Sequence, residues 1–357
     1  MRCRRVSTME MHHGGDVYGE VPVLLDLSVN LNPLGTPPEI LAVLKDEAEK
    51  VSLYPDLQCR ELRSRLSESE KIPADQIICG CGASELISLL IQCIHPGHVL
   101  LPVPAYTSYE RAIRDIGQEP VYYRLKKNNG FALTSSFLPV LKAFSHPQDM
   151  LILCNPNNPT GRLTDRSLLC EIASLCREKQ VFLLLDECFL SLCENEETSL
   201  KDQLEDNPYL FVLDSFTKKY AMPGLRLGMM YSSNTMILER MQSMKTEWSV
   251  STLSQRAGIA ALSLSGQYLS EAKGLIKKEK EFLTKNLVNL GFTVFPSDTC
   301  FILFYNESRP DLSSRLAEKG ILIRDCRDYS GLSPGFYRIA VRSHEASLLL
   351  LQALNGF

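Results

Sequence analysis

The segment from Asp214 to Gly228 gathers residue types that could do carbonyl chemistry beside an anion. Lys218 supplies a primary amine, which can form an imine with a carbonyl compound once it is unprotonated. Ser215, Thr217 and Arg226 supply two hydroxyls and a guanidinium, which are groups that can hold a phosphate. The spacing therefore predicts a nucleophilic amine next to an anion site, although a basic loop after a strand would carry similar residues.

Two segments earlier in the chain place further polar side chains at the ends of apolar runs. Asn155–Gly161 reads Asn-Pro-Asn-Asn-Pro-Thr-Gly and follows the apolar run Met150–Cys154. Its prolines fix φ and its glycine permits an unusual backbone angle, so Asn158 is expected to be held rigidly at the end of a strand. Val181–Leu185 delivers Asp186 in the same way. An ordinary turn and a polar strand cap are the alternatives.

These three segments, in this order, resemble the signature of fold-type I pyridoxal-phosphate enzymes. The resemblance implies that pyridoxal 5'-phosphate is the cofactor and that Lys218 is its Schiff-base lysine. It further implies that Asp186 pairs with the pyridinium nitrogen and that Asn158 bonds the phenolic oxygen. A carboxylate beside that nitrogen keeps it protonated, so the ring can accept electrons. Lys218 and Asp186 are the expected catalytic residues, and the cofactor phosphate is expected at Ser215, Thr217 and Arg226.

Other residues are expected to contact the same cofactor. Gly82, Ala83 and Ser84 follow a short apolar run and precede a helical pattern, so free amides and small side chains would face an anion there. The resemblance also implies that Tyr106 stacks on the ring. It implies that Tyr54 reaches the cofactor phosphate of another subunit, which would make the protein a homodimer. A common strand-to-helix turn and packing tyrosines are the alternatives.

Elements that position these residues alternate between helix and strand from about residue 40 to residue 231. The expected helices are 37–50, 58–69, 83–94, 106–116, 134–144 and 163–178. The expected strands are 76–79, 98–103, 119–124, 150–154, 181–186, 210–214 and 226–231. Alternation of this kind predicts an α/β fold with a mostly parallel sheet flanked by helices, in which ligands bind at the carboxyl ends of the strands.

The pattern changes after residue 250. Long helices are expected over Thr252–Leu264 and Gln267–Leu290, followed by short strands near 293–296, 300–305, 321–324 and 336–341. We expect a large cofactor-binding domain over 46–245 and a small α+β domain over 246–357. The segment 1–45 is expected to form an N-terminal arm and part of the small domain.

Two arginines near the C-terminus indicate a substrate with two anionic groups. Arg338 lies in Phe336–Val341, which resembles the strand that binds a substrate α-carboxylate through a planar guanidinium fork. Arg324 lies in Gly320–Asp325, which resembles the strand that supplies an arginine to a substrate phosphate in histidinol-phosphate aminotransferases. Each could instead be a surface arginine on an edge strand.

The N-terminus carries the motifs that narrow the substrate. His13-Gly14-Gly15-Asp16 and a later Ser-Val-Asn-Leu-Asn-Pro-Leu-Gly segment containing Asn30 resemble the threonine-phosphate decarboxylases of cobalamin biosynthesis. That resemblance implies decarboxylation of L-threonine O-3-phosphate. The expected substrate contacts are His13, Gly14, Asn30, Asn158, Arg324 and Arg338. A histidinol-phosphate-type aminotransferase that uses a keto-acid acceptor is the alternative.

One position departs from the aminotransferase pattern. After Asp186-Glu187 the aminotransferases usually carry Ala-Tyr, whereas this chain has Cys188 and Phe189. Loss of the tyrosine hydroxyl should weaken stabilisation of the cofactor's phenolate and raise the pKa of the lysine–cofactor imine. Phenylalanine also occurs here in the decarboxylase relatives.

Composition is typical of a cytoplasmic enzyme that acts on a small molecule. The chain has 357 residues, 45% of them hydrophobic, and a net charge of -4, so no basic excess indicates nucleic-acid binding. No window approaches the roughly 18 consecutive apolar residues of a membrane helix. The 12 cysteines are scattered and do not pair with histidine at zinc spacing. We therefore expect reduced thiols and no metal.

Overall fold

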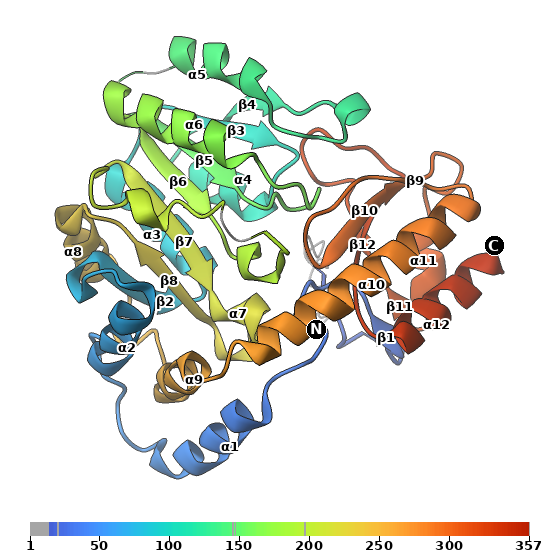
Figure 1. Ribbon diagram of the computed structural model, residues 1–357, viewed down its shortest axis with the longest axis horizontal. Helices are drawn as coiled ribbons and strands as arrows, with labels where there is room; N and C mark the ends of the chain where they lie inside the picture. The colour runs from blue at the N-terminus through green and yellow to red at the C-terminus, as the bar shows by residue number, and fades with distance from the viewer. Residues whose placement is uncertain (1–13, 20, 145, 147, 196–197, 357) are drawn as a thin grey trace, which may run out of the picture.

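Seven strands rich in Leu, Ile, Val and Met form the larger sheet of the computed structural model, which describes residues 14–19, 21–144, 146, 148–195 and 198–356 (Figure 1). These strands are β2 (Ile77–Cys81), β3 (Val99–Val103), β4 (Val121–Arg124), β5 (Met150–Cys154), β6 (Phe182–Asp186), β7 (Leu210–Ser215) and β8 (Leu227–Tyr231). Their order across the sheet is β2-β8-β7-β6-β5-β3-β4. Strand β8 runs antiparallel to both of its neighbours, and the other pairs are parallel.

The register brings several strand ends to one edge of this sheet. Cys154 at the end of β5 pairs with Asp186 at the end of β6, and Ser215 at the end of β7 pairs with Gly228 near the start of β8. Because parallel strands share a carboxyl edge, the polar residues that follow them collect there.

Helices cover both faces of the large sheet, so its central strands are apolar on both sides. One face carries α1 (Pro38–Glu47), α2 (Arg60–Glu70), α5 (Leu138–Phe144), α6 (Arg166–Lys179) and α9 (Thr252–Leu262). The other face carries α3 (Ala83–Ile94), α4 (Thr107–Asp115) and α8 (Thr235–Met244). A short helix, α7 (Phe216–Lys219), follows β7 directly. Short 3₁₀ turns lie at Ala48–Lys50, Ala74–Gln76, Lys127–Asn129, Ser135–Phe137, Leu190–Leu192, Lys201–Gln203 and Pro223–Leu225.

A second core lies at the C-terminal end of the chain. Its antiparallel sheet has the order β12 (Arg324–Asp325), β13 (Phe336–Ala340), β10 (Phe301–Tyr305) and β9 (Thr293–Val294). Helices α10 (Gln267–Asn289), α11 (Leu312–Ala317) and α12 (His344–Asn355) pack against it. Strand β1 (Leu25–Asp26) pairs in parallel with β11 (Ile321–Leu322), so the N-terminal segment joins this part of the fold. In Figure 1 the long helix α10 begins near α7 and α9 and runs across the small sheet.

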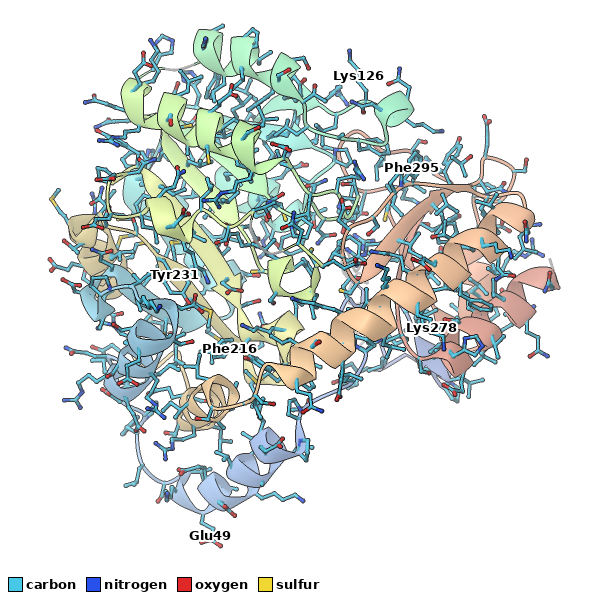
Figure 2. All side chains as sticks on the ribbon, in the orientation of Figure 1. Glu49, Lys126, Phe216, Tyr231, Lys278 and Phe295 are labelled. Atoms are coloured by element: carbon cyan, nitrogen blue, oxygen red, sulfur yellow. The ribbon has the colours of Figure 1, made fainter. Side chains whose placement is uncertain are left out.

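The aromatic side chains labelled in Figure 2 are buried beside the two sheets, and the labelled lysine side chains lie at the surface. Phe216 and Tyr231 are buried beside the large sheet and Phe295 is buried near the small one, whereas Lys126 and Lys278 are exposed. The described cysteines are all free thiols. In the part of the chain that the structure describes, no helix combines the length and apolar character needed to cross a membrane.

The expected alternation and the mostly parallel sheet are confirmed, but some elements differ from their predicted bounds. Helix α6 begins at Arg166 rather than at 163, because the Asp165 side chain caps it by accepting the Ser167 N–H. The predicted strand 321–324 is divided between two sheets. Helices α8, α11 and α12 were not predicted. Helix α9, which the prediction assigns to the small domain, packs against α1 and α2. The domain boundaries stay a prediction.

Candidate active site

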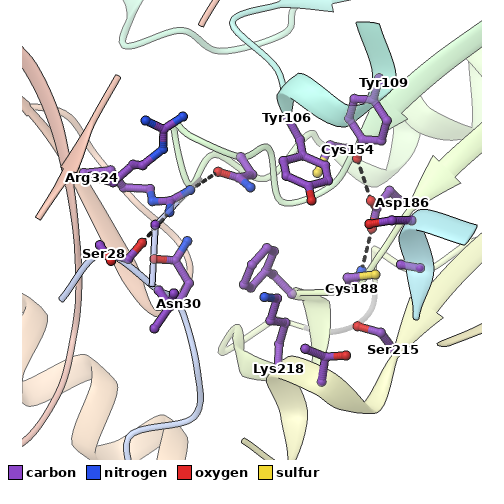
Figure 3. A pocket seen from close by; sticks show the side chains of 18 of the residues that line it. Ser28, Asn30, Tyr106, Tyr109, Cys154, Asp186, Cys188, Ser215, Lys218 and Arg324 are labelled. Atoms are coloured by element: carbon purple, nitrogen blue, oxygen red, sulfur yellow. Dashed lines mark hydrogen bonds between the residues drawn. The ribbon is translucent and has the colours of Figure 1, made fainter. Parts of the chain in front are cut away.

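A cavity of about 220 Å³ opens at the carboxyl edge of the large sheet, where that sheet faces the small one (Figure 3). Most of the residues expected from the sequence line it: Gly14, Asn30, Ala83, Ser84, Tyr106, Asn158, Asp186, Ser215, Thr217, Lys218, Arg226, Arg324 and Arg338. In Figure 3, Arg324, Ser28 and Asn30 lie on the side opposite Tyr109 and Asp186. The fold thus brings together segments that are 300 residues apart in sequence.

Two glycines allow a close-packed cradle at one end of the cavity. Gly82 precedes α3 with a φ of 79°, and a Cβ there would lie 2.6 Å from Nη2 of Arg226. A Cβ on Gly228 would lie 2.6 Å from the backbone nitrogen of Ala83. The α3 N-terminus has no side-chain cap, so its amides are available to an anion. With Ser215 lining the same end, these residues fit a phosphate group.

Lys218 reaches the cavity from α7, and the N-terminal segment holds its loop in place. The backbone N–H of Asn32 donates to the carbonyl oxygen of Lys218 (3.0 Å), and the Asn32 side-chain amide donates to that of Lys219 (2.9 Å). Burial lowers the pKa of Lys218, and the positive charges of Arg338 and Arg226 lower it further. Its amine is therefore unprotonated more readily than that of an exposed lysine.

Asp186 lies across the cavity with both carboxylate oxygens engaged. The Tyr109 hydroxyl donates to Oδ2 (2.5 Å), and the Cys188 N–H donates to Oδ1 (3.0 Å). Burial raises the pKa of Asp186, while these two hydrogen bonds favour the ionised form and oppose the rise. A cationic ring nitrogen placed beside this carboxylate would favour its ionised form in the same way.

Arg338 enters the cavity from β13 and is buried among neutral acceptors. Its guanidinium donates to Asn158 Oδ1, to the Ser28 carbonyl oxygen (2.9 Å) and to the Tyr329 hydroxyl (3.3 Å). Among the described residues, its Nε finds no hydrogen-bond partner. A buried guanidinium with an unused donor, in a residue that lines a cavity, suits an anionic ligand.

Arg324 enters from β12 and is held by its own loop. Nη2 lies 2.6 Å from Oδ2 of Asp328, and Nη1 donates to the carbonyl oxygen of Asp325. The guanidinium carbon lies 5.0 Å from the centre of the Tyr329 ring. Both arginines are buried and line one cavity, as expected, so the alternative of two surface arginines does not apply.

Two predicted residues among those that the structure describes, Gly82 and Tyr54, do not line this cavity. Gly82 lies directly behind the Arg226 guanidinium, as described above. Tyr54 is 78% exposed and its ring packs on Trp248 at a centroid distance of 4.7 Å, so its contact with a partner subunit stays a prediction. His13 falls outside the described residues.

Sequence reasoning missed several residues that line the cavity. Tyr109 and Tyr329 are the main ones, with Ser28 and Cys154 beside them. Tyr109 could have been found, because it lies three residues after Tyr106 at the start of the same expected helix, on a neighbouring face. Tyr329 carried no such signal, since it lies in an irregular loop.

Comparison with known proteins places the chain in a family. The family model for class I and II aminotransferases matches residues 22–354. A threonine-phosphate decarboxylase of Salmonella typhimurium is 35% identical over 96% of each chain. A histidinol-phosphate aminotransferase of Desulfitobacterium hafniense is 32% identical over 85% of this chain and 84% of its own.

A solved structure agrees with this family assignment. The histidinol-phosphate aminotransferase of Clostridium acetobutylicum superposes with a TM-score of 0.84 at 28% identity, over 93% of this chain and 98% of its own. The cradle, the buried amine and the buried carboxylate described above fit the cofactor of this family. The chain therefore belongs to the class I and II aminotransferase family and is a pyridoxal-phosphate-dependent enzyme.

Proposed function

We propose that this enzyme decarboxylates L-threonine O-3-phosphate to (R)-1-aminopropan-2-ol O-phosphate and carbon dioxide, the linker unit of the cobalamin nucleotide loop. The observation that carries the proposal is the pair of buried arginines, Arg324 and Arg338, facing one cavity. Two fixed guanidiniums suit a small substrate with two anionic groups. The 35% identity to a threonine-phosphate decarboxylase over 96% of both chains supports the same reaction.

The position of each arginine supports a separate role. Arg338 contacts Asn158 and is close enough to Lys218 for its charge to lower that lysine's pKa, so it suits the carboxylate attached to the reacting carbon. Arg324 is not among the main causes of that shift and suits the more distant phosphate. Gly14 and Asn30 line the same end of the cavity, and His13, outside the described residues, completes the proposed substrate contacts.

The other cavity residues are proposed to hold the cofactor. Lys218 would carry it, Asp186 would face its ring nitrogen, and Asn158 would bond its phenolic oxygen. Tyr106 would cover its ring, and the residues that would hold its phosphate are Gly82, Ala83, Ser84, Ser215, Thr217 and Arg226. Bound pyridoxal phosphate supplies an electron-accepting ring that stabilises negative charge at the substrate Cα.

The chain's own residues then decide which Cα bond breaks. By holding the carboxylate, Arg338 orients the bond between Cα and the carboxyl carbon, and breakage of this bond releases carbon dioxide. The electron pair left at Cα takes a proton, for which Lys218 is the proposed donor in its ammonium form, after it has taken up a proton from the substrate's ammonium group. If the same contacts oriented the Cα–H bond instead, transamination would follow. The aminotransferase with a keto-acid acceptor is therefore the alternative, and the relative of Desulfitobacterium hafniense supports it.

We also propose that the enzyme acts as a homodimer in the cytosol. Val51, Leu53 and Tyr54 expose between 65% and 78% of their surface, and Tyr54 packs on the half-exposed Trp248. Such an apolar patch suits contact with a second copy, through which Tyr54 would reach the partner's cofactor phosphate. The free thiols suit a reducing compartment.

One assay separates the two reactions. The holoenzyme is given L-threonine O-3-phosphate with and without 2-oxoglutarate, and carbon dioxide and glutamate are measured together. Decarboxylation predicts carbon dioxide without any need for 2-oxoglutarate, whereas release of glutamate alone would refute the proposal.

The Arg324→Ala variant tests the phosphate contact within the same assay. It should lose about ten-fold or more in kcat/KM for threonine phosphate and keep its low rate on threonine, because a hydrogen bond to a charged group contributes roughly 1.5–3 kcal/mol. Arg327→Ala is the matched control: its guanidinium lies three residues further on, is half exposed and pairs with Asp325. Equal discrimination in wild type and Arg324→Ala would remove the phosphate role.

A further inference from the structure

Tyr329 lies between the two cavity arginines and touches both of them. Its hydroxyl accepts a hydrogen bond from Nη1 of Arg338 (3.3 Å). Its ring lies under the guanidinium of Arg324, at 5.0 Å from the guanidinium carbon to the ring centre. The side chain lines the cavity and is only 3% exposed. A single side chain thus contacts both guanidiniums.

The Tyr329 hydroxyl belongs to a side chain that lines the cavity, and its proton is an unused hydrogen-bond donor. An arginine can only donate, so the contact with Arg338 uses a lone pair of the hydroxyl and leaves its proton free. None of the described residues accepts that proton. Nε of Arg338 and Oδ1 of Asn30, two buried atoms of residues that line the same cavity, also find no partner within the described part of the chain. Buried polar groups are normally satisfied, so these three atoms together point to a polar ligand.

The loop around Tyr329 holds the ring in this position. The Tyr329 N–H donates to the Cys326 carbonyl oxygen (3.1 Å), and the Leu332 N–H donates to the Tyr329 carbonyl oxygen (2.9 Å). Burial raises the pKa of Tyr329, so its hydroxyl remains protonated near neutral pH and can act as a donor.

We propose that Tyr329 is a specificity-determining residue that donates its hydroxyl proton to the substrate carboxylate held by Arg338, while its ring fixes the distance from that carboxylate to the phosphate at Arg324. The identity of the ligand rests on the proposed function. The hydroxyl recognises the carboxylate alone, whereas the ring supports both anion contacts. Removing the hydroxyl and removing the ring should therefore have different effects.

Two ligands that differ only in the carboxylate test this division. L-Threonine O-3-phosphate carries both anions, and 1-aminopropan-2-ol O-phosphate carries the phosphate alone. Dissociation constants are measured on the holoenzyme from the change in the cofactor's absorption spectrum, under conditions where binding precedes turnover, and carbon dioxide release is measured separately. Tyr329→Phe should weaken the carboxylate-bearing ligand about ten-fold or more and leave the other unchanged.

A second variant and a control complete the design. Tyr329→Leu removes the ring as well and should weaken both ligands, because Arg324 loses its support. Tyr337→Phe is the matched control: Tyr337 is a fully buried tyrosine next to Arg338 on β13, and its hydroxyl donates to the Arg309 carbonyl oxygen instead of facing the cavity. It should change neither affinity.

The outcomes separate this inference from the proposed function. An equal change in both ligands with Tyr329→Phe, or no change in either, would overturn the role of Tyr329. If the wild type releases no carbon dioxide but Tyr329→Phe still weakens only the carboxylate-bearing ligand, the decarboxylase proposal fails and the role of Tyr329 stands. If the wild type binds neither ligand, both are overturned.

Discussion

Replacing Tyr109 by phenylalanine should slow the enzyme by altering the carboxylate of Asp186. Tyr109 is fully buried on α4, and its hydroxyl makes one of the two hydrogen bonds that Asp186 receives. Burial raises the pKa of Asp186, and the Tyr109 hydrogen bond opposes that rise. Its loss removes the hydrogen bond that opposes this rise most strongly, so the pKa of Asp186 should rise further.

The size of the effect follows from the charge on the acceptor. A hydrogen bond to a charged group contributes roughly 1.5–3 kcal/mol, and each 1.36 kcal/mol is tenfold in rate or affinity. We therefore expect kcat to fall about ten-fold or more near neutral pH. Because the active form needs an ionised Asp186, activity should be lost at a higher pH as the solution is acidified.

The assay is the pH profile of kcat, with cofactor affinity measured alongside it. Tyr122→Phe is the control, since Tyr122 also donates to a carboxylate, Oε2 of Glu110 on the same helix, but does not line the cavity. A Tyr109→Phe enzyme with the acid limb and turnover of the wild type would show that Asp186 does not depend on this hydrogen bond.

Three other perturbations have defined outcomes. Lys218→Ala should abolish the visible absorption band of the bound cofactor, whereas Lys219→Ala should retain it; a band that survives in Lys218→Ala would exclude Lys218 as the attachment point. Gly82→Ala should weaken cofactor binding about ten-fold or more by equilibrium titration, because its Cβ would lie 2.6 Å from the Arg226 guanidinium at a φ of 79° that side chains rarely adopt. Burial raises the pKa of Glu187 to about 7, so the folded state binds the proton more tightly than the unfolded state, and the free energy of unfolding should fall as pH rises from about 4.5 to about 7. Glu187→Gln should remove this contribution, a change on the order of 3 kcal/mol in the free energy of unfolding across this pH range, and denaturant titrations of the apoprotein that show the same pH dependence in the variant and the wild type would contradict it.

The cofactor half of the site could be predicted because its residues lie in short segments that end or follow apolar runs. Asp186 and Ser215 each end a strand, and Asn158 and Lys218 lie within four residues of one. Parallel strands bring their carboxyl ends to one edge, so the order of motifs in the chain was enough to bring these residues together. The large sheet was predictable for the same reason.

The substrate half depended on contacts that no local pattern contains. Arg338 donates to the carbonyl oxygen of Ser28, 310 positions away in sequence, and a backbone acceptor has no residue type to recognise. Tyr329 reaches both arginines from a loop. The helices missed in the C-terminal half are a different case, since Ser343 caps α12 and Asn234 caps α8, and both are residues that favour helix starts.

The position of β8 in the large sheet has a consequence for how the protein is made. Gly82 and Ala83 follow β2, Ser215 ends β7, and β8, the last of the seven strands to be synthesised, lies between β2 and β7. A nascent chain in which residue 231 has not yet emerged from the ribosome therefore has no complete phosphate cradle. Pairing over such a sequence separation is intrinsically slow to form. Since Arg338 meets Ser28 only after nearly the whole chain has been synthesised, the growing polypeptide should acquire affinity for its cofactor before it acquires affinity for its substrate.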